Sequence, residues 1–424
     1  IKMLVELEKI FSTIELNLID SEEDLTITTQ FRDLMKIFTN LSSIFEQAII
    51  KNKDEFIRTI RHIFRLFKVL FQLKDGTFSH DTLSSKSNQI IREQIIDQLN
   101  ENEKIFPLIL IYHDVGRFFD RQNHPYKSYQ LIIENNLLDS YNLTDNDKLL
   151  VIKIIQYHLL QATIYTGEST FYGVYSLLHD IEFIPIISNK KNREKFLDIL
   201  NIFTFIDILG YNYAKIYDHY VDFYAEINLI LKDIFNAWPD KESILKKAQK
   251  YSQKWLEWRI AGALRIFQFV HTKPYLTKEF YYNLIRDSVK MSENSLIKKI
   301  DWQDLKDIHL KDSYKIQIKY GLGVLMILSF GAFFRSWLNE DTKISDNLIL
   351  FWILLSHEIQ SRSKGRVKWL WNVFFTGLPH WSKWNRNTFI KLNPLLLEKI
   401  IKISKHNFNQ NTKTCELYLD FGLD

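Results

Sequence analysis

The sequence predicts an all-α protein, and two observations carry this prediction. Glycine (12) and proline (7) are scarce among the 424 residues, although tight turns and β-hairpins depend on these two residues. Long segments also carry apolar and charged residues at the spacing of helix faces, as in Phe56–Leu73. Isoleucine is common and its β-branch favours strands, so composition alone leaves the class open. Together, few turn residues and helical spacing favour long helices joined by few loops.

We expect three parts along the chain: a helical segment over residues 1–73, a central domain over 74–237 and a helical carboxy-terminal domain over 238–424. The turn signal Lys74-Asp-Gly-Thr77 marks the first division, and Trp238-Pro-Asp240 marks the second. Thr144 or Asp145 is expected to cap a central helix. The predicted helices of the central domain are Asn88–Asn100, Phe106–Phe119, Tyr126–Asn136, Asp145–Gln161, Phe171–His179 and Asn192–Tyr213.

Charge and cysteine content narrow the class of protein. The formal net charge is only +4, with acids and bases interspersed, which is no argument for nucleic acid or a membrane as partner. Cys415 is the only cysteine, so we expect no disulfide, no thiolate metal site and a reducing, cytoplasmic location. The apolar runs Gly321–Phe334 and Asn347–Ser356 are shorter than the roughly 20 residues of a membrane span. Buried core helices explain them better.

Four histidines and two aspartates form the strongest functional signal. Their wide spacing suits separate helices whose inner faces converge on one site. Asp207 lies in the apolar segment NIFTFIDILG, where a buried carboxylate needs a cation or strong hydrogen bonds. The candidate metal ligands are His80, His113, Asp114, His124, His158 and Asp207.

These residues stand in motifs that resemble those of the HD superfamily of metal-dependent phosphohydrolases. His113-Asp-Val-Gly-Arg117 is similar to the family's His-Asp-hydrophobic-Gly-basic motif, and Val151–Leu160 is similar to its apolar helix ending in His-Leu-Leu. The other similar segments are Asp75–His80, Asn123–Ile132 and Phe203–Leu209. The resemblance covers about Asp75 to Tyr213 and is greatest to the uridylyl-removing domain of bacterial nitrogen-signalling uridylyltransferases. No nucleotidyltransferase motif precedes it, so that particular activity is not carried over.

The resemblance implies an HD-type helical bundle and a site for two divalent ions bridged by Asp114. Histidine and carboxylate ligands suit Mn, Fe, Co, Ni, Zn or Mg. Such a site favours hydrolysis of a phosphoester or phosphodiester of a nucleotide-type small molecule by metal-activated hydroxide. Arg117 is a candidate catalytic residue that pairs with a phosphate. We place Lys127 and Lys153 with Arg117 as candidate substrate-binding residues.

Several alternatives stay open at this point. The same ligands suit a di-iron oxygenase of the HD fold, and the protein is alternatively a non-catalytic signalling protein. A second pair, His179-Asp180, lacks the following glycine and is interpreted as incidental or as support near His158. The segment Arg362–Arg386 interleaves basic and aromatic residues, which would suit nucleic acid, but a helical core or oligomer interface is favoured. The basic stripe of Phe56–Leu73 is interpreted as a solvated helix face.

Overall fold

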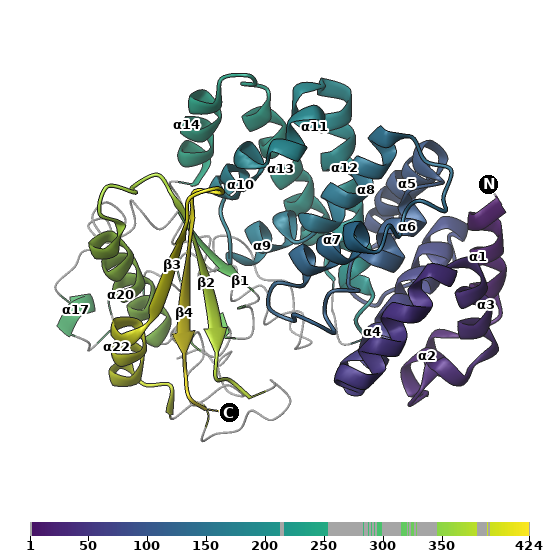
Figure 1. Ribbon diagram of the computed structural model, residues 1–424, viewed down its shortest axis with the longest axis horizontal. Helices are drawn as coiled ribbons and strands as arrows, with labels where there is room; N and C mark the ends of the chain where they lie inside the picture. Colours follow the sequence, from purple (N-terminus) through teal and green to yellow (C-terminus); the bar gives the residue numbers. More distant parts are fainter. Residues whose placement is uncertain are drawn as a thin grey trace. The chain divides into compact units, whose positions relative to one another are not determined.

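The computed structural model describes residues 2–212, 216–252, 295–298, 315–319, 346–379 and 391–423, with a few isolated positions between 283 and 388. The chain divides into two compact units (Figure 1). The first unit comprises Ile1–Ala162 and Ile186–Lys232, and the second comprises Thr163–Pro185 and Asp233–Asp424. The division at Lys232 lies close to the break predicted at Trp238. The predicted division near Lys74 is not a unit boundary, because the amino-terminal helices belong to the first unit.

The first unit is built of helices around the long helix α4 (Ser42–Asp75), which packs against α1, α2, α5, α6 and α12. Asn52 interrupts α4 with non-helical dihedral angles, and its side chain accepts a hydrogen bond from the Glu55 amide, which restarts the helix. Gly76 ends α4 in the left-handed conformation at φ 74°, as the predicted turn there requires. The other helices are α1 (Lys2–Ser12), α2 (Leu16–Ser21), α3 (Thr29–Ile37), α5 (Ser85–Asn102), α6 (Phe106–Tyr112), α7 (His124–Glu134), α8 (Asp145–Gln156) and α12 (Lys190–Leu209), with α9 (Leu160–Thr166), α11 (Ile184–Ser188) and α13 (Asp218–Phe235) running across the unit boundaries.

The basic residues of α4 hold the amino-terminal helices and are not a purely solvated stripe. Arg65 donates to both carboxylate oxygens of Asp20 at 2.6 Å. Arg61 donates to the carbonyl of Glu22, and Lys68 donates to the carbonyl of Phe11. These contacts tie α1 and α2 to the same helix that enters the candidate site.

The central helices follow the prediction, with two shifts that matter for the site. Thr144 caps α8, since its hydroxyl accepts from the Asp147 amide. The helix predicted over Phe106–Phe119 ends at Tyr112, and the chain continues in turns to Phe119. The helix predicted over Asp145–Gln161 ends at Gln156. His113, Asp114 and His158 therefore lie just beyond helix ends.

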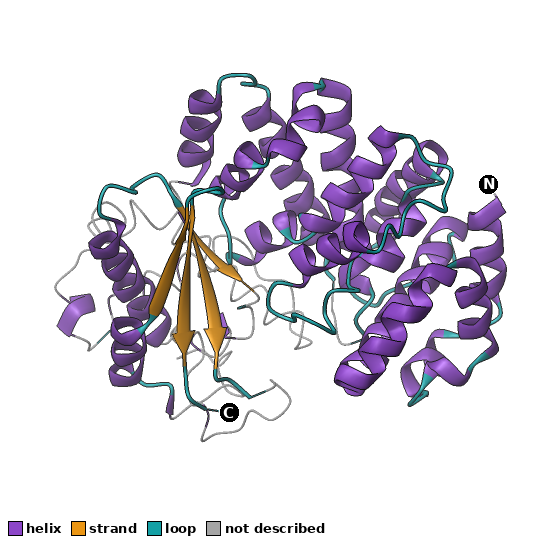
Figure 2. Ribbon diagram, in the orientation of Figure 1, coloured by secondary structure: helices purple, strands orange, loops and turns teal. Residues whose placement is uncertain are grey.

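The second unit contains a four-stranded sheet in addition to its helices (Figure 2). The strand order is β1-β2-β4-β3, with β1–β2 and β2–β4 parallel and β3–β4 antiparallel. In register, Trp371 of β2 lies between Ile316 of β1 and Cys415 of β4. The strands are β1 (Ile316–Lys319), β2 (Leu370–Thr376), β3 (Lys405–Asn409) and β4 (Thr414–Asp420), and the helices are α10 (Val174–His179), α14 (Lys241–Ser252), α17 (Ser295–Lys298), α20 (Asp346–Ser363) and α22 (Pro394–Ile403).

The described part of the chain is mostly helical, which confirms the predicted class. The sheet corrects one detail, because the carboxy-terminal part was expected to be helical throughout. Strands β2 and β4 are short and mostly apolar, and such runs are hard to tell from buried helices without their distant partners. One face of the sheet shares a hydrophobic core with α20 and α22, and Trp371 is buried in it.

The apolar run Asn347–Ser356 lies within α20 and is buried there, as predicted. Most of the other run, Gly321–Phe334, lies outside the described residues, as do Trp381 and Trp384. Among the described helices, none combines the length and the apolar character needed to span a membrane. In the basic and aromatic segment, residues Leu370–Thr376 form strand β2, so the expected helical core is wrong for this part, although Trp371 is buried. The Arg366 guanidinium lies over the half-buried rings of Trp369 and Phe408.

Candidate metal centre

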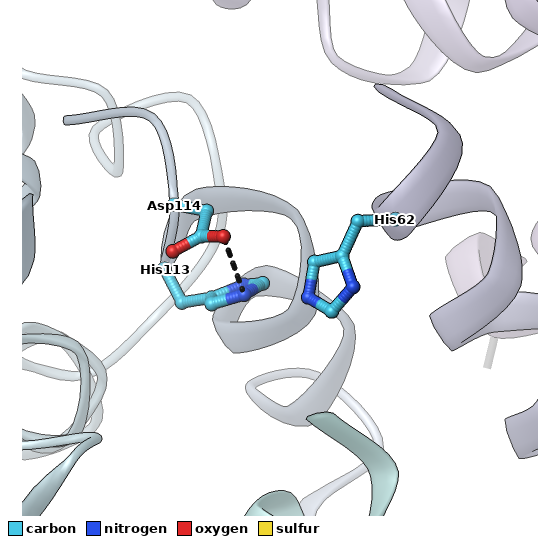
Figure 3. A group of neighbouring side chains, drawn as sticks. All are labelled: His62, His113 and Asp114. Carbon is cyan, nitrogen blue, oxygen red and sulfur yellow. Dashed lines mark ion pairs between the residues drawn. The ribbon is translucent and has the colours of Figure 1, made fainter. Parts of the chain in front are cut away.

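Two groups of buried side chains in the first unit have the arrangement of metal ligands, and Asp114 belongs to both. One group is His62, His113 and Asp114, and the other is Asp114, His124 and His158; within each, the ligand atoms lie within 4.8 Å of one another. Figure 3 shows His62 reaching from α4 toward His113 and Asp114. Asp207 of α12 adjoins the first group, with Oδ1 2.9 Å from His62 Nε2 and 3.5 Å from His113 Nε2. We call these six residues the candidate metal centre.

All four histidines are anchored in the same way. Each Nδ1 contacts a backbone carbonyl: His113 that of Leu110, His124 that of Arg121, His158 that of Ile155 and His62 that of Gly210, at 2.8–3.1 Å. Because a carbonyl only accepts, each Nδ1 donates to its carbonyl, and each Nε2 is the ring nitrogen that faces the carboxylates. Metal-binding histidines in proteins are held by such contacts.

The two oxygens of Asp114 face different partners. Oδ1 lies 3.2 Å from His124 Nε2 and 4.0 Å from His158 Nε2. Oδ2 lies 3.6 Å from His113 Nε2 and 3.0 Å from Arg117 Nη1. A carboxylate in this position can bridge two cations. The buried Nε2 of His113 has no hydrogen-bond partner among the described residues, which fits a site built for a cation.

A close approach of two backbones positions Asp114 relative to His124. The Gly116 amide donates to Ser128 Oγ at 2.8 Å, and Ser128 Oγ donates to the His113 carbonyl at 2.7 Å. A Cβ at Gly116 would lie 2.9 Å from the carbonyl carbon of Lys127 and still closer to other backbone atoms of α7. Only glycine lets the turn after His113 lie against the start of α7, where His124 is located.

A second close approach holds His62. A Cβ at Gly210 would lie 2.6 Å from His62 Cε1, and the Gly210 carbonyl accepts a hydrogen bond from His62 Nδ1. The ring of Tyr211 also stacks on His62, with ring centroids 4.2 Å apart. The end of α12 therefore sets the position of the His62 ring.

The electrostatics of the centre favour a bound cation. Burial lowers the pKa of His124 to about 3 and that of His158 to about 4, so both rings are neutral at pH 7. Burial also opposes charge on His113, but Asp114 and Asp207 outweigh it and raise the pKa of that ring. Burial opposes ionisation of Asp114, yet His113 and Arg117 hold its pKa well below the usual range. Two ionised, buried carboxylates thus attract positive charge to the centre.

Arg117 is engaged by protein side chains. Its Nη1 donates to Asp114 Oδ2 at 3.0 Å and to the Tyr211 hydroxyl at 2.9 Å, and its Nε donates to Glu55 Oε1 at 3.1 Å. Glu55 is buried on α4. Arg117 therefore orients Asp114 and connects it to α4, and its contact with a phosphate stays a prediction.

The two lysines predicted to bind substrate lie on α7 and α8. Lys153 is buried, and its ammonium contacts Gln156 Oε1 at 2.9 Å and lies over the Tyr129 ring. Lys127 is half-buried on α7. Their contact with substrate stays a prediction. His179 caps its own helix, with Nδ1 on the Tyr175 carbonyl, and Asp180 caps the turn after it, in keeping with an incidental pair.

The structure corrects one ligand. His80 belongs to neither group; it lies in the loop after α4, where its Nδ1 contacts Thr82 Oγ1 at 2.9 Å. His62, and not His80, joins His113 and Asp114 in the first group. The signal was present in the sequence, because His62 has the apolar neighbours Ile60 and Ile63, whereas His80 follows a polar turn. His113, Asp114, His124, His158 and Asp207 are brought together as predicted.

Comparison with known proteins adds no relative to this picture: no family model, no curated protein and no solved structure matches the chain.

Proposed function

We propose that the protein is a metal-dependent phosphohydrolase that cleaves a phosphoester or phosphodiester of a nucleotide-type substrate. The observation that carries the proposal is the shared position of Asp114 between two groups of buried, carbonyl-anchored imidazoles. Six nitrogen and oxygen ligands in this arrangement suit two divalent ions. The resemblance to HD phosphohydrolases independently supports the same reaction.

Bound divalent ions would supply an acidified water and polarise the phosphate. The chain itself contributes position and environment. Arg117 keeps the Asp114 carboxylate oriented and ionised, and Tyr211 and Gly210 hold His62. Phe203 contacts the rings of His113 and His158 and covers them on one side, which limits the access of bulk water. Because His124 and His158 are neutral at pH 7, their Nε2 atoms need lose no proton before binding a cation.

Elemental analysis of the purified full chain, beside hydrolysis of bis-p-nitrophenyl phosphate with added Mn²⁺, tests the proposal. We expect bound metal and turnover in the wild type, and loss of both in Asp114→Ala. His80→Ala is the matched control, which should retain metal. A metal-free wild type that leaves the diester intact would overturn the proposal. Bound iron with oxygen consumption and no hydrolysis would favour the oxygenase instead.

The location that goes with this function is a reducing, cytoplasmic one. The sole cysteine, Cys415, is a buried free thiol in β4, and the proposed ligands include no thiolate. The proposed substrate, a nucleotide-type phosphoester, is a cytoplasmic metabolite class.

A further inference from the structure

A cavity of about 200 Å³ lies in the first unit next to the candidate metal centre. Arg65 lines it from α4, one turn after His62, and Tyr211 lines it just beyond the end of α12, which carries Asp207. The loop after α4 supplies the remaining wall through Phe78, His80 and Asp81. The cavity is therefore lined by continuations of the two helices that hold His62 and Asp207.

Tyr211 is common to the cavity and the centre. Its ring stacks on His62 at 4.2 Å and 23°, and its hydroxyl accepts a hydrogen bond from Arg117, which also contacts Asp114. A group bound against Tyr211 in the cavity would therefore be separated from the candidate metal ligands by this one side chain. If the phosphate of a phosphoester were bound at the metal centre, its organic part would extend into the cavity.

The walls suit a flat, uncharged group with hydrogen-bonding edges. The rings of Phe78 and His80 lie 27° from parallel with centroids 6.4 Å apart, and Tyr211 adds another ring. The Arg65 charge is neutralised by Asp20, which accepts two hydrogen bonds at 2.6 Å. Asp81 is exposed and anionic at the rim, which disfavours a phosphate here. Its carboxylate can accept from ring or exocyclic N–H groups, as nucleobases present.

The size of the cavity limits the occupant. Sites for drug-sized ligands are about 300–1,000 Å³, so a cavity of about 200 Å³ holds one base and not two. A mononucleotide-type ester, or the terminal residue of a longer one, fits this limit.

We infer that this cavity binds the nucleobase of the substrate, and that Phe78 and His80 hold the base by stacking on it. The inference rests on the proposed function and assigns His80 a role at the substrate in place of the metal-ligand role expected from the sequence. Aromatic stacking on bases tolerates different bases, so the hydrogen-bonding edges of Asp81 and Asn212 would set the preference among them.

Nucleoside binding tests this inference without using the metal centre. Adenosine, guanosine, cytidine and uridine are titrated into the full chain in EDTA by calorimetry, with ribose as the probe that lacks a base. We expect at least one nucleoside to bind about tenfold more tightly than ribose, the scale of one stacking contact. Phe78→Leu, which keeps apolar volume, and His80→Ala should each remove most of that difference. His406→Ala, an exposed histidine in β3, is the matched control and should not change it.

Two outcomes overturn the inference: no nucleoside binds more tightly than ribose, or Phe78→Leu and His80→Ala bind like the wild type while melting normally. The metal content of His80→Ala distinguishes a base-binding role from a metal-ligand role. Loss of metal in this variant would make His80 a ligand and contradict its role in base binding. Nucleosides carry no phosphate, so a failure to hydrolyse esters leaves this test unaffected. Turnover of bis-p-nitrophenyl phosphate with no nucleoside binding would sink the inference alone.

Discussion

Oδ1 of Asp114 lies 3.2 Å from Nε2 of His124, on the side of the carboxylate opposite to the oxygen that Arg117 contacts. This relationship divides the candidate metal centre into two halves. His124 and His158 belong to one half, and His62, His113 and Asp207 belong to the other. The Asp114 carboxylate is the only ligand common to both groups among the described residues.

Metal stoichiometry should follow these two halves. We expect His124→Ala to lose about one of two bound ions and Asp114→Ala to lose both, because Asp114 serves both groups. His62→Ala should also lose about one ion, whereas His80→Ala should lose none. Elemental analysis of the four purified variants measures this. Equal loss in His80→Ala and His62→Ala would contradict the assignment of His62.

Gly116→Ala should disturb the site through the backbone. The added Cβ would lie 2.9 Å from the Lys127 carbonyl carbon, so α7 or the turn must move, at a cost of about 1–3 kcal/mol in the free energy of unfolding. His124 would move with α7, and its half of the centre should bind metal more weakly.

Gly365→Ala is the control for that variant. Gly365 has φ 83° and no atom within 4 Å of a built Cβ, so alanine there costs about 1 kcal/mol from backbone strain alone. Chemical denaturation and metal content of both variants separate the two effects. Undiminished metal affinity in Gly116→Ala would argue against the role of this close approach.

Arg117→Met should destabilise the fold as well as the site. It leaves Glu55, whose side chain is 6% exposed, without its Arg117 partner, and breaking a buried ion pair from one side costs about 3–5 kcal/mol. The double variant Glu55→Gln with Arg117→Met should recover a large part of that loss. Urea denaturation of both single variants and the double variant gives the coupling. Additive losses would show that the pair does not act as a unit.

Cys415 should be unreactive in the folded protein. Burial first, and then the neighbouring Glu416 carboxylate, raise the pKa of its thiol to about 12, compared with about 8.5 for a free cysteine. The unfolded chain therefore ionises first, and the free energy of unfolding should fall as the pH rises above about 8.5.

Labelling with a disulfide reagent at pH 8 measures this directly. The native protein should react slowly and the urea-unfolded protein within the mixing time, since only the thiolate attacks. Fast labelling of the native protein would show that β4 opens readily.

The helical class and most residues of the candidate site could be predicted from the sequence. The cap at Thr144 could be predicted locally, since its hydroxyl accepts from the amide of Asp147, only three residues away. Asp207 in an apolar helix signals a buried carboxylate that needs compensation. The motif around His113 and Asp114 carries Gly116, whose role depends on atoms of α7 only twelve residues further along.

The apolar neighbours of His62 made it a candidate, but choosing His62 over His80 required the tertiary contact between α4 and the end of α12, nearly 150 residues away. It also decided that Arg117 serves Asp114 and Glu55, since neither the charge nor the spacing of an arginine reveals its partners. The sheet also depended on tertiary structure, because Trp371 of β2 pairs with residues of β1 and β4 that are each more than forty residues away in the chain. Local sequence patterns indicate interactions between residues that are close in the chain, such as helix caps and turns. Which side chains converge is set by packing between segments that are far apart in the chain.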